Sequence, residues 1–176
     1  RASWSAFCVL LLSALWATPG ITQADLTSLV RERLAYMQDV AAYKWQHKLP
    51  IQNIEREARV LASAQQQALR HGLEQQSTHA FFSGQIRAAR EIQAYWFEHW
   101  QRTGDAPVAA RSLDEDIRPA LLTLGEEITG ALAHGSQKIG AIDLPGLQPG
   151  TLDELRRAAA SVSRYNNRLD QVLRSG

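Results

Sequence analysis

The chain lacks features that mark several large classes of protein. It contains one cysteine, Cys8, so a disulfide within these 176 residues is excluded. Its 19 basic and 18 acidic residues nearly cancel, and such a balance gives no overall field to attract nucleic acid or an anionic membrane. The five histidines include no i,i+4 pair. We therefore expect no metal site and no nucleic-acid partner.

The first 24 residues differ in composition from the rest. The run from Ala6 to Leu15 is almost wholly apolar, and Arg1 is the one charged residue before Asp25. A run of ten residues is too short to span a bilayer. We therefore predict a signal peptide over residues 1–24, cleaved near Ala24, and a periplasmic or secreted protein that is not held in the membrane. Since Cys8 lies in this leader, the mature chain would have no thiol nucleophile.

From residue 25 onward, apolar residues recur at three-to-four-residue steps, which is typical of helices, and no strand-like alternation is long enough to predict a sheet. Asp25 and Asn53 are suitable N-caps, and Thr151 with Glu154 forms a capping box. The expected helices cover residues 25–46, 54–69, 79–103, 113–133 and 151–173. We predict one all-α domain of five or six helices over 25–176, with a core at 25–104 and a C-terminal helical extension at 105–176. Three tryptophans, at positions 45, 96 and 100, are interpreted as core residues.

The stretch from Arg33 to Glu57 carries the chemistry. Arg33 and Lys44 are 11 residues apart, so at about 100° per residue they return to the same face of a helix. After the break at Pro50, a second helix places Arg56 and Glu57 in its first turn. If the two helices pack side by side, three cations and a carboxylate converge. That arrangement suits a small dianion that bears a hydroxyl.

These residues resemble a known family. Arg33-x10-Lys44, then Leu-Pro-Ile-x-Asn-x-x-Arg-Glu ending at Glu57, with Gln85-Ile86 and Ile92-Gln93 further on, resembles the all-helical chorismate mutases. The leader, the motif from Ala41 to Trp45 and the long extension make the chain look like their secreted subclass. The resemblance implies an isomerase of phenylalanine and tyrosine biosynthesis, which rearranges chorismate to prephenate within one molecule and without a cofactor. It also implies a homodimer.

The resemblance also implies roles for single residues. Lys44 and Gln93 would donate to the ether oxygen of the substrate, while Arg33 and Arg56 would bind its carboxylates. Asn53 and Glu57 match the positions that contact the ring hydroxyl. The secreted subclass takes a further arginine from a later helix, for which the candidate is Arg118, with Arg111 as the alternative. Each of these side chains could instead be an ordinary solvated residue on a helix surface.

Two positions depart from the family pattern: Asn53 stands where Asp is usual, and Ala89 where Ser or Thr binds a carboxylate. Gln93 matches the family, although several secreted relatives carry Glu there. An amide donates a hydrogen bond at any ordinary pH, so Gln93 predicts activity that is flat from mildly acid to neutral pH. The losses at Asn53 and Ala89 favour a rival hypothesis, a non-catalytic exported helical bundle that binds a small dicarboxylate or a protein partner. Turnover of chorismate distinguishes the two.

Overall fold

The computed structural model describes residues 25–164. The predicted signal peptide, with its cleavage point at Ala24, and the predicted helix beyond residue 164 lie outside the described residues. The described elements are helices only, so the all-α prediction is confirmed. They are α1 (Leu26–Gln46), α2 (Ile54–Arg70), α3 (Gln75–Thr103), the π-helical turn η1 (Leu113–Ile117), α4 (Arg118–Ala133) and α5 (Pro149–Ser161). Within 25–164, no helix has the length and apolar character needed to cross a membrane.

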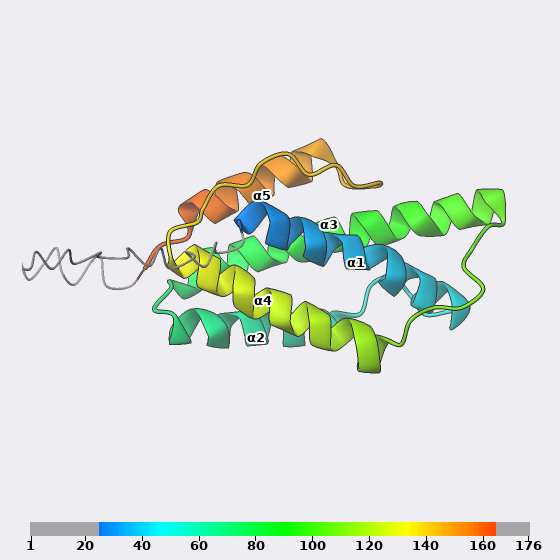
Figure 1. Cartoon of the computed structure of the whole chain (residues 1–176), viewed down its shortest axis with the longest axis horizontal. Helices are drawn as coiled ribbons and strands as arrows, with labels where there is room; N and C mark the ends of the chain where they lie inside the picture. The colour runs from blue at the N-terminus through cyan, green and yellow to red at the C-terminus, as the bar shows by residue number, and fades with distance from the viewer. Residues whose placement is uncertain (1–24, 165–176) are drawn as a thin grey trace, which may run out of the picture.

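The helices form an elongated bundle around α3 (Figure 1). Helix α3 packs against α1, α2 and α5, and α4 closes the other side of α1 and α2. The colours of Figure 1 show that α1 and α3 run in the same direction, whereas α2, α4 and α5 run in the opposite one. Positions near the starts of α1 and α3 therefore lie at one end of the bundle, together with the ends of α2 and α4.

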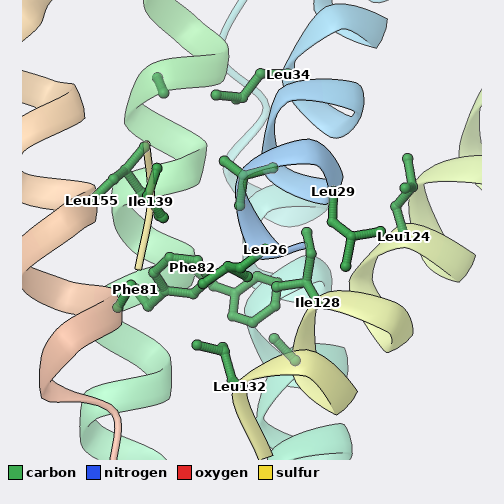
Figure 2. Packing of buried hydrophobic residues seen from close by; sticks show 14 of the residues in the cluster. Leu26, Leu29, Leu34, Phe81, Phe82, Leu124, Ile128, Leu132, Ile139 and Leu155 are labelled. Carbon is green, nitrogen blue, oxygen red and sulfur yellow. The ribbon is translucent and has the colours of Figure 1, made fainter. Parts of the chain in front are cut away.

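Two apolar clusters hold this bundle together. In the larger cluster, Phe81 and Phe82 of α3 are 0% and 1% exposed, and Figure 2 shows them between Leu155 of α5, Leu26 of α1 and Ile128 of α4. A smaller cluster joins the ends of α1 and α3, where the rings of Trp45 and Trp100 lie 6.0 Å apart and Trp96 and Trp100 5.7 Å apart. The interpretation as core is confirmed for Trp100, whereas Trp45 and Trp96 are half-buried and pack against this cluster.

The first two helices begin where the sequence predicts. The Asp25 carboxylate accepts a hydrogen bond from the Thr27 N–H at 3.1 Å, and the Asn53 side chain accepts one from the Arg56 N–H at 2.9 Å. Each cap satisfies an N–H group that has no partner inside its helix. Both caps act within a few residues, which is why sequence alone locates them.

The start of the third helix is predicted too late. Helix α3 begins at Gln75 because the Glu74 carboxylate accepts hydrogen bonds from the N–H groups of Gln76 and Ser77, at 2.8 and 2.6 Å. Ser77 and Thr78 thus lie inside the first turn, where both hydroxyls donate to the Glu74 carbonyl. The helix is therefore capped by a glutamate and starts four residues before the predicted position 79.

The last helix also differs from its prediction. It begins at Pro149 and ends at Ser161, and the Thr151 hydroxyl donates to Glu91 of α3 at 2.6 Å instead of capping the helix. After Ser161 the chain becomes extended and returns to the start of α3, where the Glu74 N–H donates to the Ser163 carbonyl at 2.8 Å. This contact between distant segments ends the helix before residue 173.

Candidate active site

A pocket of about 620 Å³ lies between α1, α2, α3 and the segment from η1 into α4. Apolar side chains from every one of these elements form part of its wall, among them Leu34, Val60, Phe82 and Ile117. All the residues that the sequence proposes for the site, the alternative Arg111 apart, lie on this wall, namely Arg33, Lys44, Asn53, Arg56, Glu57, Gln93 and Arg118. Helices far apart along the chain thus contribute to one site.

The two candidates for the later arginine lie in different places. Arg118 lines the pocket and forms an ion pair with Asp114, one turn earlier. Arg111 lies outside the pocket wall, where it pairs with Asp39 at 3.2 Å and stacks over the Tyr36 ring at 5.4 Å. Of the two alternatives, the geometry therefore favours Arg118.

Lys44 lies in the last turn of α1, just before the loop that leads to α2. Lys48 takes a positive φ of 53°, and the Leu49 N–H donates to the Lys44 carbonyl at 2.8 Å, which brings the chain back over the helix end. The Lys44 ammonium then donates to the Ile51 carbonyl at 2.5 Å and to the Gln93 Oε1 at 2.8 Å. Burial lowers the pKa of Lys44, Glu57 opposes that shift, and Arg118 adds to it.

The Gln93 amide is held in one orientation. Its oxygen accepts from Lys44, so its nitrogen faces the opposite way and donates to the Ala89 carbonyl at 3.0 Å. The amide nitrogen has a second hydrogen, whose nearby acceptor is the Met37 sulfur at 3.7 Å. Because a thioether is a weak acceptor, this second N–H remains available to a better acceptor in the pocket.

Arg33 and Arg56 approach the pocket from α1 and α2. The Arg33 guanidinium donates to the Leu121 carbonyl of α4 at 2.6 Å. Burial, with a smaller contribution from Arg56, lowers the pKa of Arg33 to about 10. Burial also lowers the pKa of Arg56, with further lowering by Arg118 and Arg59. Arg56 thus acts on Arg33, and Arg118 acts on both Arg56 and Lys44, as expected for cations that line one pocket.

The pocket carries an excess of positive charge. Six cationic and two acidic side chains line it. Three of the cations have acidic partners: Arg118 with Asp114, Arg90 with Glu57 at 3.8 Å, and Arg59 with Glu55 at 3.8 Å. Among the described residues, the other three have no carboxylate within 4.0 Å, and they are Arg33, Lys44 and Arg56. Cations without acidic partners in a partly apolar pocket are suited to bind an anion.

Sequence reasoning missed two buried glutamines on the pocket wall. Gln67 is 3% exposed and Gln85 is 2% exposed. Gln67 follows Arg56 by 11 residues, the same spacing that places Arg33 and Lys44 on one face, so the signal was present. Gln85 lies on the helical stripe of Gln93, but nothing local indicates that its amide is buried.

A family model and two characterised relatives are similar to this chain in sequence. A family model described as chorismate mutase type II matches residues 22–94. The monofunctional chorismate mutase of Enterobacter agglomerans is 35% identical over 114 residues, which are 65% of this chain and 62% of that protein. The secreted chorismate mutase of Yersinia pestis is 35% identical over 106 residues, 60% of this chain and 56% of that protein. The chain thus matches less than two thirds of the length of these two relatives.

Solved structures extend the likeness to the fold. The crystal structure of the secreted chorismate mutase from Yersinia pestis matches with a TM-score of 0.73 and 27% identity, over 79% of this chain and 97% of that one. The crystal structure of the chorismate mutase from Burkholderia phymatum matches with a TM-score of 0.61 and 33% identity, over 66% of this chain and 73% of that one. With this identity over most of a solved relative, the chain belongs to the type II, all-helical chorismate mutase family.

Proposed function

We propose that the protein is an exported chorismate mutase, an isomerase that converts chorismate to prephenate by an intramolecular Claisen rearrangement. The observation that carries this proposal is the convergence of three cations without acidic partners, Arg33, Lys44 and Arg56, with the Gln93 amide in one pocket of a chain from this family. Chorismate is a dicarboxylate with a ring hydroxyl. It matches the charge and the polar groups of that pocket.

Binding supplies the first part of the rate acceleration. Arg33, Arg56 and Arg118 hold the two carboxylates and so keep the flexible side chain of the substrate folded over its ring. Freezing a reactive conformer in this way removes several kcal/mol from the barrier. Asn53 uses its side-chain oxygen for the helix cap, which leaves its NH₂ group for the ring hydroxyl beside Glu57.

Lys44 and Gln93 act on the reacting atoms. As the ether C–O bond breaks and the new C–C bond forms, negative charge develops on the ether oxygen. The Lys44 ammonium and the second N–H of Gln93 donate to that oxygen. These two groups already lie side by side, with the ammonium 2.8 Å from the amide oxygen, and donors placed in advance favour the transition state over the ground state.

The test is chorismate consumption by the purified protein beside Lys44→Ala, which excludes a contaminating mutase. Saturable turnover that the substitution abolishes supports the enzyme. A rival function, binding of a small dicarboxylate without turnover, is favoured by one observation: Ala89 lines the pocket without a hydroxyl. A folded protein that binds a bicyclic transition-state analogue and leaves chorismate unchanged would establish the rival.

We also propose a periplasmic or secreted location and a homodimer, with a complete pocket in each subunit. The predicted leader at 1–24 and the name of the secreted relative from Yersinia pestis support export, and the family resemblance supports the dimer. The extension at 105–176 supplies Arg118 to the core at 25–104. Cell fractionation and light scattering test the location and the dimer independently of activity.

A further inference from the structure

The side chain of Gln85 is buried and forms no hydrogen bond with the part of the chain that the structure describes. It lies on α3, is 2% exposed and lines the pocket. Within residues 25–164, its Nε2 and Oε1 are the buried side-chain nitrogen and oxygen atoms that have no hydrogen-bond partner. Buried polar groups in native proteins are nearly always paired, and an unpaired one lowers the stability of the fold. An amide kept at such a position needs a reason other than folding.

The other two buried glutamines of the pocket show the difference. The Gln67 Oε1 accepts from the Thr129 hydroxyl at 3.3 Å, and both ends of the Gln93 amide have partners. Gln85 occupies the same pocket and the same helix as Gln93, yet none of the described residues 25–164 forms a hydrogen bond with its amide. Its donors and acceptor thus have no partner among the described residues that a ligand in the pocket would have to displace.

The position of Gln85 along the pocket identifies the part of the ligand that it meets. Since α1 and α3 run in the same direction (Figure 1), equal steps backward along them lead to the same end of the pocket. From the contact between Lys44 and Gln93, Arg33 lies about 16 Å back along α1 and Gln85 about 12 Å back along α3, at about 1.5 Å per residue. Gln85 therefore lies toward the Arg33 end of the pocket.

We propose that the Gln85 amide donates a hydrogen bond to the substrate carboxylate that Arg33 binds. Ala89, one turn further along the same helix, has no hydroxyl to do so, and Gln85 takes over that contact. A carboxylate accepts several hydrogen bonds, so it can use Gln85 in addition to the guanidinium. This inference rests on the proposed function for the identity of the anion, and on the unpaired amide for the contact.

The first test compares Gln85→Leu with the wild type. We expect KM for chorismate to rise about 10- to 100-fold, the factor of a hydrogen bond to a charged group, while the melting temperature stays the same or rises. The matched control is Gln101→Leu, the same substitution at an exposed position of the same helix and outside the pocket wall. It should change neither value. An unchanged KM with a lower melting temperature would show that the amide has only a structural role, such as holding a buried water.

The second test identifies the carboxylate. Calorimetry measures binding of a bicyclic dicarboxylate transition-state analogue and of its two monomethyl esters to wild type, Gln85→Leu and Arg33→Met. We expect the ester whose binding is insensitive to Arg33→Met to be insensitive to Gln85→Leu as well. The proposal is wrong if Gln85→Leu leaves the binding of the other ester unchanged instead. It is also wrong if Gln85→Leu weakens the binding of both esters equally.

Failure of the proposed function gives a different result. A wild type that binds the analogue without converting chorismate contradicts the enzyme, and the comparison of the two esters still decides the role of Gln85. A wild type that neither binds the analogue nor converts chorismate contradicts both proposals.

Discussion

The two ends of the pocket are built differently. At the Lys44 end, formed by Lys44, Ile51 and Gln93, each polar group already has a protein partner, with contacts of 2.5 and 2.8 Å. At the Arg33 end, formed by Arg33, Gln67 and Gln85, the guanidinium has a carbonyl but no carboxylate within 4.0 Å, and Gln85 has no partner at all among the described residues.

Under the proposed function, this difference separates two tasks. Donors that meet the reacting atoms gain from being fixed before the substrate arrives. Groups that bind the unreacting carboxylate contribute through affinity, and they can remain without anionic partners until the ligand supplies one. Substitutions at the Lys44 end should therefore impair turnover with little effect on folding. Those at the Arg33 end should impair binding and leave the free protein as stable as before, or more so.

The largest effect is expected at the Lys44 end. Lys44→Ala removes one donor and releases the Gln93 amide that the ammonium orients, so kcat should fall more than about 10³-fold, beyond the loss of a single preorganised donor. The melting temperature should change little, because Lys44 is only half-buried. Steady-state kinetics and thermal unfolding measure the two quantities. Lys138→Ala, at an exposed lysine outside the pocket wall, is the control and should retain full activity.

Arg33→Met should give the opposite combination at the other end. Removing a cation that has no carboxylate partner relieves a desolvation cost, so the free protein should be at least as stable to urea. Binding of the transition-state analogue should weaken about 100-fold, as expected for the loss of a charged bidentate contact. Analogue at about 100 times its Kd stabilises the wild type by about 2.7 kcal/mol, and this gain should largely disappear. A marked loss of stability in the free variant would instead show that Arg33 mainly stabilises the packing of α1 against α4.

Gln93→Glu should make the Lys44 end sensitive to pH. An ionised carboxylate at position 93 cannot donate and pairs with Lys44, so both donors are withdrawn, and kcat at pH 7 should fall about 10- to 100-fold. Activity should return as the pH falls and the carboxyl is protonated, whereas the wild type stays flat between about pH 5 and 7. A steep loss of wild-type activity in that range would contradict the role of Gln93.

At alkaline pH the wild type should lose activity below the ordinary lysine pKa of 10.5, because burial lowers the pKa of Lys44.

The features that sequence predicted correctly are local ones. Asp25 and Asn53 cap helices within three residues of themselves, and Arg33 and Lys44 share a face because helical geometry alone sets their spacing. The wrong boundaries depend on distant partners. Thr151 donates to Glu91 of another helix, and the chain after Ser161 pairs with the start of α3. No window along the sequence contains both members of such a pair.

The same distinction applies to the site. The residues of α1 and α2 were named from a continuous motif, but Arg111 and Arg118 could not be separated. Arg111 lies outside the pocket because it pairs with Asp39 on α1. Arg118 follows the π-helical turn η1, which leads the chain into the pocket wall. Whether the Gln85 amide has a hydrogen-bond partner depends on the groups that all the neighbouring helices place around it. This can be learned only from the packed fold.

The smallest effect is expected for Ala89→Ser, and it sharpens the comparison between the two ends. If Gln85 already donates to the carboxylate, a hydroxyl at position 89 should add little, and KM should fall less than about fivefold, the lower part of the range for one hydrogen bond. In the Gln85→Leu background the same serine should recover a larger part of the lost affinity, because two residues that serve one group are not additive. Steady-state KM values of the four combinations measure this coupling. Equal effects of the serine in both backgrounds would mean that residues 85 and 89 meet different parts of the substrate.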